Sequence, residues 1–343
     1  MINSICILRL SAIGDVTHAL PVIATLQNRF PNAKITWIIG KIEYKLMKGL
    51  KGVEFVLFDK SKGSKGYKEV KEQLKDTTFD VLLQMQYSFR ANRLAWKIKA
   101  KQRVGFDKKR SREFHSYKLT HRIAAVEKQH VLDSFMEFTK VLGVKEKEFI
   151  YQWNIETEAD DQKFVNQYIQ KDRKNVIISP CSSKKTRNWS VENYAKIADY
   201  LVEKYQAHVI ICGSPSPYEI EIAGEIEELC KHPVTNIAGK DTLKQLYLMM
   251  KSADLVISPD SGPMHIANAA RTPVIGLHIA TISKRSGAYN YPNLAIDVFD
   301  QAAGLVGKNP EKIRWGGQVV HPEAMNLITQ EMVREKIDLV LGV

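Results

Sequence analysis

The amino-acid sequence predicts an α/β protein of two Rossmann-like domains that face each other across a cleft. Short apolar segments of strand length alternate with amphipathic segments of helix length along most of the chain. The alternation stops in a polar stretch, 145–174, and then resumes. The 343 residues also suffice for two domains that each bury their own core.

The first half of the chain alternates as a parallel sheet covered by helices requires. Its strands are almost wholly apolar, which is typical of parallel strands buried on both faces. We expect strands at 5–10, 33–40, 52–58, 79–85 and 103–106, and helices at 18–30, 65–76, 90–100 and 130–144.

The second half repeats this pattern. We expect strands at 175–180, 208–213, 254–259 and 272–279, and helices at 191–205, 218–230, 242–253, 264–271 and 328–343. The predicted organisation is an N-terminal domain (1–150), a junction (151–174), a C-terminal domain (175–327) and a last helix (328–343) able to pack back on the N-terminal domain.

Composition points to an anionic partner. Hydrophobic residues make up 44% and charged residues 26%, as in soluble globular proteins, while the formal net charge is +12. Nucleic acid, an acidic membrane surface or a phosphorylated substrate would each suit this charge. The four cysteines lack the spacing of a disulfide framework, which favours a reducing compartment. No apolar run approaches the ~20 residues of a membrane span, so we expect a cytoplasmic protein whose membrane contact is peripheral.

Ligands in such sheets bind beyond the carboxyl ends of the strands, and four strand ends carry unusual residues. The first is SAIGD, after strand 5–10. Gly14 permits a tight turn and Asp15 can point into the cleft, although an aspartate there can equally be a helix N-cap. His18, one turn later, either contacts a ligand or is a helix residue with a core or surface role and no part in binding.

The second strand end is SPCSSKKTRNWS, 179–190. Its hydroxyl, amide and basic groups suit a diphosphate, although a solvated basic loop would look the same. The candidate ligands are Ser182, Ser183, Lys184 and Arg187. Trp189 is expected to pack rather than to stack on a base.

The third strand end, SPDSGPMHIANAA at 258–270, combines a strand end with a helix start. Pro263 suits the first helical turn, and the amides around it form an anion cradle at the positive end of the helix. Asp260 orients a sugar hydroxyl or caps the turn. The candidate ligands are Asp260, Ser261, Gly262, Met264 and His265.

The fourth strand end, CGSPSPYEIEIA at 212–223, contributes Glu219. Acidic residues at comparable places bind ribose hydroxyls. The N-terminus of a helix, however, stabilises any carboxylate, whether or not it binds a ligand.

Taken together, these stretches resemble the heptosyltransferases of bacterial lipopolysaccharide core synthesis, glycosyltransferase family 9, which use ADP-heptose. LRLSAIGDVTHALP (8–21) is similar to the family's N-terminal signature. DSGPMHIANAARTPVIGL (260–277) is similar to its C-terminal signature, and TRNW (186–189) resembles its basic-x-Trp step. The resemblance covers most of the chain and is strongest to the enzymes that add the first heptose to Kdo (heptosyltransferase I).

The resemblance implies a GT-B architecture, with the acceptor on the N-terminal domain, ADP-heptose on the C-terminal one, and inversion at the sugar. Asp15 would then be the general base that takes the proton of the acceptor hydroxyl. The stretch from Ser182 to Arg187 and the amides of Gly262–His265 would stabilise the departing ADP. No cluster of metal-ligand spacing is present in the sequence, so we expect no obligatory metal or other cofactor.

The implied acceptor is a Kdo-bearing lipid A at the inner face of the cytoplasmic membrane. Between Lys97 and Lys118 the chain carries nine Lys or Arg against Asp107 and Glu113, which fits anionic headgroups as well as a solvated loop. Candidate acceptor contacts are Gly14, His18, Lys45, Arg90, Arg93, Arg110 and Arg112.

Three alternatives remain open. A nucleic-acid-binding protein would explain the charge and the aromatic residues within the basic run, but no nucleic-acid motif is present. A dinucleotide oxidoreductase would explain the α/β pattern, but SAIGD stands where GxGxxG is needed. A transferase that uses another nucleotide sugar, or adds a later core heptose, is the main competitor.

Overall fold

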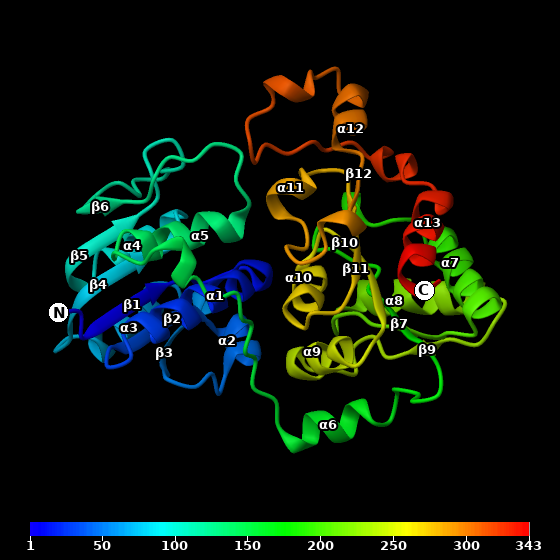
Figure 1. The fold of residues 1–343 in the computed structure, drawn as a ribbon, viewed down its shortest axis with the longest axis horizontal. Helices are drawn as coiled ribbons and strands as arrows, with labels where there is room; N and C mark the ends of the chain where they lie inside the picture. The colour runs from blue at the N-terminus through cyan, green and yellow to red at the C-terminus, as the bar shows by residue number, and fades with distance from the viewer. Residues whose placement is uncertain (343) are drawn as a thin grey trace. The chain divides into compact units, whose positions relative to one another are not determined.

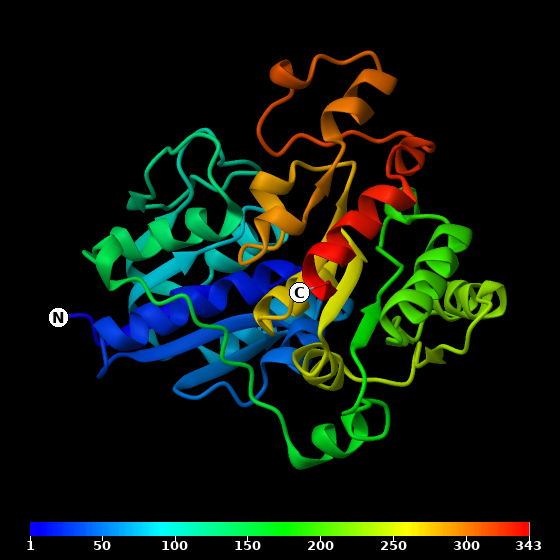
Figure 2. The same ribbon diagram turned by 45° about the vertical axis from the view of Figure 1, so that its right-hand side comes forward.

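The computed structural model describes residues Met1–Gly342, which form two compact units that divide after Glu156. Figure 1 and Figure 2 show both as sheets flanked by helices, the first blue to green and the second green to red. The division after Glu156 falls inside the stretch 151–174 that the sequence marks as the junction.

The first unit contains a six-stranded parallel sheet in the order β3-β2-β1-β4-β5-β6. This is the strand order of a Rossmann fold, and it reverses between β1 and β4. Side chains of β1 are almost all buried because helices cover both faces of the sheet. The strands are β1 Ser4–Leu8, β2 Lys34–Gly40, β3 Val53–Phe58, β4 Thr78–Gln84, β5 Lys99–Gly105 and β6 His121–Arg122.

The helices of this unit connect successive strands of the sheet. The long helix α1 packs along α5, and nearly every residue from Val16 to Leu26 is buried, so this part of the helix is covered on all sides. The helices are α1 Ile13–Arg29, α2 Lys41–Met47, α3 Ser64–Gln73, α4 Phe89–Ala95 and α5 Val131–Lys140.

The second unit repeats the topology. Its sheet has the order β12-β11-β10-β7-β8-β9, the same Rossmann order, which reverses between β7 and β10. The strands are β7 Asn175–Ile178, β8 His208–Ile211, β9 Thr235–Asn236, β10 Leu255–Pro259, β11 Val274–His278 and β12 Ile296–Asp297. The helices are α6 Ala159–Val165, α7 Val191–Tyr205, α8 Pro217–Leu229, α9 Leu243–Lys251, α10 Gly262–Ala269, α11 Ser283–Ser286, α12 Phe299–Leu305 and α13 Gln330–Leu341.

The last helix, α13, belongs to the core of the second unit. It packs on α7 and β11, and Val333, Ile337 and Leu341 join the buried cluster there. Its apolar face is thus covered within its own unit, and the expectation that this helix also packs on the N-terminal domain stays a prediction.

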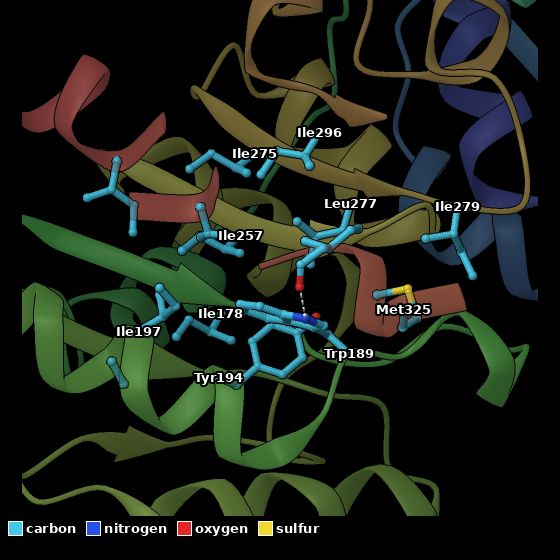
Figure 3. Packing of buried hydrophobic residues seen from close by; sticks show 14 of the residues in the cluster. Ile178, Trp189, Tyr194, Ile197, Ile257, Ile275, Leu277, Ile279, Ile296 and Met325 are labelled. Carbon is cyan, nitrogen blue, oxygen red and sulfur yellow. Dashed lines mark hydrogen bonds between the residues drawn. The ribbon is translucent and has the colours of Figure 1, made fainter. Parts of the chain in front are cut away.

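The same cluster holds Trp189, which lies edge-on to Tyr194 and donates its indole N–H to the carbonyl of Ile328 at 2.9 Å (Figure 3). Trp189 is only 3% exposed, so its predicted packing role is confirmed.

One predicted helix is too long. The segment 90–100 was expected to be helical throughout, but α4 ends at Ala95 and β5 begins at Lys99. Trp96 and Ile98 extend the apolar pattern of the helix, whereas Lys99 and Lys101 already follow the alternation of a half-exposed strand. Among the described residues, no helix is both long and apolar enough to cross a membrane.

Candidate active site

Each unit gathers its polar motifs where its strand order reverses, which is where such sheets bind ligands. In the first unit, SAIGD follows β1 and the polar segment 84–88 follows β4. In the second, the segment 181–188 follows β7, and Asp260 with the start of α10 follows β10. The two units are described separately below.

Asp15 is the third residue of α1 rather than its N-cap. The N-cap is Ala12, whose backbone N–H donates to Oδ2 of Asp15 at 3.4 Å. The same oxygen forms an ion pair with Nη2 of Arg9. The Asp15 side chain remains about one-third exposed, so an anchored carboxylate lies at the surface beyond the end of β1.

Arg9 is a site residue that the sequence analysis did not select. Its guanidinium is buried, donates from Nη1 to the carbonyl of Met85 at 2.6 Å and lies 5.2 Å from the ring of Phe135. It thereby links Asp15 to the chain that leaves β4. The signal was present in the sequence, because a lone arginine stands inside the apolar run ICILRL.

The structure does not bring His18 to the surface. His18 is 1% exposed, and its ring lies edge-on to that of His130, with centroids 5.5 Å apart. Gly14 is also buried, and its carbonyl accepts a hydrogen bond from the Thr17 hydroxyl at 2.7 Å. Of the three residues selected in this stretch, only Asp15 presents a side chain to an acceptor.

The basic acceptor candidates fall into two groups. Four of them have exposed side chains, on α2, on α4 and in the loop after β5: Lys45, Arg90, Arg93 and Arg112. Arg110 is different, because its guanidinium pairs with Asp107 and donates to Gln129, to Ser134 and to the carbonyl of Ala124. Arg110 therefore ties this loop together, and a ligand would have to displace those contacts.

A buried polar network holds the same loop against β4 and α4. Nε2 of His115 accepts the N–H of Phe106 at 2.9 Å, so the neutral ring carries its proton on Nδ1, 3.0 Å from Oδ1 of Asn92. Gln84 donates to the same Asn92 oxygen at 2.7 Å. Burial lowers the pKa of His115 to about 4, with a smaller effect from Arg122, so the ring stays neutral at pH 7.

In the second unit, Arg187 and Asp260 join the two strand ends. Nη1 of Arg187 lies 2.9 Å from Oδ2 of Asp260, and both side chains are nearly buried. Thr281, beyond β11, donates its hydroxyl to the same oxygen at 2.5 Å. Burial disfavours the charge of Asp260, but His278, the Thr281 hydroxyl and the nearby cations outweigh it and hold the pKa of this carboxyl below its usual range.

This pair changes the expected role of Asp260. The carboxylate was predicted to orient a sugar hydroxyl or cap a turn, whereas here it orients the guanidinium of Arg187. Nε of Arg187 is buried without a hydrogen-bond partner. The guanidinium therefore places a fixed positive charge beside the strand ends.

The serine and lysine groups before Arg187 are partly used within their own loop. The Ser182 N–H donates to the side-chain oxygen of Asn188 at 2.7 Å, and the Ser182 hydroxyl accepts from the Lys184 N–H at 3.2 Å. The Lys184 ammonium contacts Gln318 at 2.8 Å. Ser183 is exposed. Ser182 thus shapes the loop, whereas Ser183 is placed to meet a ligand.

The predicted anion cradle lies at the N-terminus of α10. Pro263 lies in the first turn, and the N-cap Ser261 makes no side-chain cap; its hydroxyl lies 3.0 Å from that of Ser258. The first amides of the helix, from Gly262 onward, therefore have no capping side chain and point beyond the end of β10. Met264 offers only its amide because its side chain is fully buried.

Two further features shape this cradle. His265 is 9% exposed. Gly276, on β11, leaves room for the side chains beside it. A Cβ at this position would lie 2.8 Å from the Met264 sulfur and 2.9 Å from the His278 ring, so a larger residue would force these buried groups to move.

Glu219 lies at the carboxyl end of β8 with Asp241 close by. One oxygen of Glu219 accepts a hydrogen bond from the Ser214 N–H at 2.7 Å. Part of the hydrogen-bonding capacity of this carboxylate is therefore used by its own loop. Burial raises the pKa of Asp241 to about 7, opposed by a backbone hydrogen bond and reinforced by the charge of Glu219. Sequence reasoning missed Asp241, since a lone aspartate after a turn carries no distinctive signal.

The first unit thus carries an anchored, partly exposed carboxylate, and the second a nearly buried arginine beside a helix start that no side chain caps. Within Met1–Gly342, no group of three or more His, Cys, Asp or Glu side chains is arranged to hold a metal ion.

Known glycosyltransferases are similar to this chain in sequence and in fold. The chain is 42% identical over 336 residues to the lipopolysaccharide core heptosyltransferase OpsX of Haemophilus influenzae, covering 98% of this chain and 95% of that protein. Its fold matches a glycosyltransferase family 9 protein from Veillonella parvula (TM-score 0.81, 20% identity, 99% and 97% of the two chains). It also matches Escherichia coli heptosyltransferase WaaC with ADP (TM-score 0.76, 17% identity, 98% and 99%).

These folds confirm the predicted α/β, GT-B class with two Rossmann-like domains. The family description "Glycosyltransferase family 9 (heptosyltransferase)" matches residues 67–303, and the chain belongs to that family of glycosyltransferases.

Proposed function

We propose that this enzyme transfers heptose from ADP-heptose to a Kdo residue of the lipopolysaccharide inner core, with inversion at the sugar and Asp15 as general base. The observation that carries the proposal is the partly exposed Asp15 carboxylate, fixed by Arg9 beyond the end of β1. The 42% identity to OpsX, named a lipopolysaccharide core heptosyltransferase, supports the reaction class.

In this reaction the acceptor hydroxyl oxygen attacks the anomeric carbon from the face opposite ADP. A new C–O bond forms as the bond to the ADP phosphate breaks, and its electron pair leaves with ADP. The hydroxyl proton moves to Asp15, which is a carboxylate and so able to receive it.

The second unit supplies the stabilisation of the leaving group. Negative charge grows on the ADP phosphate as the bond breaks, and preorganised donors there lower the barrier most. The Arg187 guanidinium, held by Asp260, and the uncapped amides of α10 are such donors. Glu219 then suits the ribose hydroxyls, and Ser183 the diphosphate. The structure of Escherichia coli heptosyltransferase WaaC, which has the same fold, is a structure with ADP, and this supports the choice of nucleotide.

We further propose a cytoplasmic location with peripheral association at the inner membrane. A Kdo-lipid A acceptor is lipid-anchored and phosphorylated, and the formal charge of +12 favours such a partner. The exposed Lys45, Arg90, Arg93 and Arg112 are the acceptor contacts this proposal favours.

Asp15→Asn tests the proposal. Asn keeps the size of the side chain and an oxygen for the Ala12 N–H, but it cannot accept the proton. With ADP-heptose and a Kdo-lipid A acceptor, kcat should fall by roughly 10²–10⁴, while the melting curve and the dissociation constant for ADP-heptose stay near those of the parent. Glu54→Gln, at an exposed carboxylate of β3, is the matched control.

Turnover by Asp15→Asn within a few-fold of the parent would rule Asp15 out as the base. A panel of nucleotide sugars in the same assay tests the donor, and an acceptor that already carries heptose tests whether a later core heptose is added. Preference for a donor other than ADP-heptose would replace the proposed substrate without changing the reaction class.

A further inference from the structure

Three exposed aromatic rings and one partly buried ring contact one another in the first unit. Phe89 begins α4, Trp96 follows that helix, and Phe114 and Tyr117 lie in the loop after β5; we call these four residues the aromatic patch. Ring centroids are 6.2 Å apart for Phe89 and Trp96, 6.5 Å for Phe89 and Phe114, and 5.3 Å for Trp96 and Tyr117.

The aromatic patch is exposed to an unusual degree. Phe89, Phe114 and Tyr117 are 50%, 73% and 58% exposed. Among the exposed large apolar side chains of Met1–Gly342, these three are the aromatic ones. Apolar rings gathered in this way mark an interaction surface more often than scattered single residues do.

The backbone holds the rings outward at a cost. Glu113 and Phe114 have φ values of 51° and 63°, in the left-handed region that is unfavourable for residues with a side chain. The gain that offsets this is not burial of Phe114, because Phe114 is the most exposed of the four rings. Such a conformation persists where the surroundings enforce it, and it often marks a functional position.

The surroundings do enforce it. The side-chain amide of Asn92 donates to the carbonyls of Arg112 and Glu113 at 3.3 and 2.7 Å, and His115 holds the loop from its buried side. The loop is therefore a fixed platform for Phe114 and Tyr117.

Basic residues flank the residues of the aromatic patch along the chain. Four exposed basic residues adjoin the rings in sequence, and the Lys118 ammonium lies 5.5 Å from the Tyr117 ring. The two carboxylates of the region are already engaged, Glu113 by the N–H of Phe89 and Asp107 by Arg110. We call the four basic residues the basic rim: Arg90, Lys97, Arg112 and Lys118.

We propose that the aromatic patch and its basic rim dock this protein on an anionic lipid bilayer. Aromatic side chains favour the interface between water and hydrocarbon, and lysine and arginine bind anionic headgroups at its surface. The inference rests on the proposed function, since a lipid-anchored acceptor requires the enzyme to work at a bilayer.

The arrangement favours a bilayer over single-stranded nucleic acid. Bases stack on the open faces of aromatic rings. Here the rings meet edge to face, at interplanar angles of 65–90°, so ring faces are used within the aromatic patch. A bilayer interface demands no such open faces.

The test measures binding of the full-length protein to vesicles of phosphatidylglycerol and phosphatidylethanolamine by co-sedimentation. Phe114→Ser with Tyr117→Ser should weaken binding about tenfold or more. Lys97→Gln with Lys118→Gln should weaken it by roughly 25-fold at low salt, at about a factor of five per charge. Neither pair includes a proposed acceptor contact, so transfer to a delipidated, water-soluble acceptor should be unchanged.

Matched controls come from exposed positions outside the aromatic patch and basic rim. Lys65→Gln with Lys68→Gln, on α3, removes the same charge, and Leu229→Ser with Leu305→Ser removes similarly exposed apolar groups. Both controls should bind vesicles as the parent does. A melting curve shows that each variant is folded, and the lysine pair keeps the test decisive if the aromatic pair is not.

Three results would overturn the proposal: vesicle binding unchanged in both patch variants, equal losses in the controls, or binding of the parent to a single-stranded oligonucleotide but not to vesicles. Failure of the proposed function is separate, because it would appear as no heptose transfer by the parent protein to the water-soluble acceptor.

Discussion

The carboxylate of Asp15 and the guanidinium of Arg9 act as one unit at the end of β1. Arg9 reaches both Asp15 and the carbonyl of Met85 with different nitrogens, a contact that suits the fork of arginine and not the single ammonium of lysine. Arg9 is therefore a positioning residue that acts through Asp15.

Arg9→Lys should lower kcat by roughly tenfold with little change in KM for the donor, because it loosens the carboxylate of Asp15, the proposed general base. In an Asp15→Asn background the same substitution should have no further effect on kcat. The measurement is kcat for the four proteins of this cycle. Equal losses in both backgrounds would mean that Arg9 supports the fold and not the base.

Arg187 and Lys184 offer a second contrast between neighbouring charges. Arg187 is nearly buried beside Asp260, whereas Lys184 is exposed and contacts Gln318. Arg187→Ala should cost on the order of 2–4 kcal/mol of transition-state stabilisation, and Lys184→Ala much less. Arg187→Lys, which keeps a partner for Asp260, separates lost catalysis from lost stability. Small and equal effects on kcat/KM would show the segment to be a solvated loop.

The role of a residue was predictable from the sequence where its neighbours along the chain determine that role. It was not predictable where contacts with distant parts of the chain determine it. The start of α10 follows from Gly262 and Pro263 in the local sequence. The burial of His18 depends on α5, more than a hundred residues later, and the pairing of Arg187 with Asp260 joins residues 73 apart. No periodicity reports such contacts.

At the scale of elements, long strands and helices were predictable because their apolar spacing is set by burial on a known face. The two-residue strands β6, β9 and β12 were missed, since segments so short carry no period. The end of α4 was predicted too late because Trp96 and Ile98 continue its helical pattern of apolar residues. In the structure both residues lie after the helix has ended.

Asp241, in the turn between β9 and α9, should make the stability of the protein depend on pH. The pKa of Asp241 is about 7 in the folded protein and near 3.8 when unfolded, so between these values the folded state holds a proton that the unfolded state has released. Stability therefore falls as pH rises from about 4 to about 7, and stays lower above that. Asp241→Asn removes this loss.

Melting temperatures of the parent and of Asp241→Asn measure the effect. The advantage of the Asn variant should be larger at about pH 8 than at about pH 5. Asp300→Asn, at an exposed position on α12, controls for loss of one negative charge. An advantage that does not depend on pH would contradict a raised Asp241 pKa.

At the scale of the whole molecule, the two units use one topology for two chemical tasks. Both reverse their strand order after the first strand and place their polar residues there. In the first unit the helix that follows carries a carboxylate in its first turn, and in the second the corresponding strand ends carry an arginine and free amides. The repeated fold was predictable from the repeated alternation, while the division of tasks follows from a few residues at the strand ends.

Each unit has its own core, which predicts that the second unit folds and binds nucleotide alone. Its cluster spans β7 to α13 and includes Val333, Ile337 and Leu341, so a fragment from Thr157 to the C-terminus should melt cooperatively. ADP should raise its melting temperature, since a ligand that binds only the folded state stabilises it by about 2.7 kcal/mol at one hundred times Kd. UDP at the same concentration should raise it less.

A second fragment sharpens this test. Ending the chain at Leu327 removes α13 and the Ile328 carbonyl that Trp189 binds, so this fragment should lose several kcal/mol of stability and unfold at a lower temperature. If it melts like the longer fragment, α13 contributes little to the core. If the longer fragment is folded but its melting temperature does not respond to ADP, the nucleotide site needs residues outside the second unit, and the assignment of the donor to α10 and Arg187 alone fails.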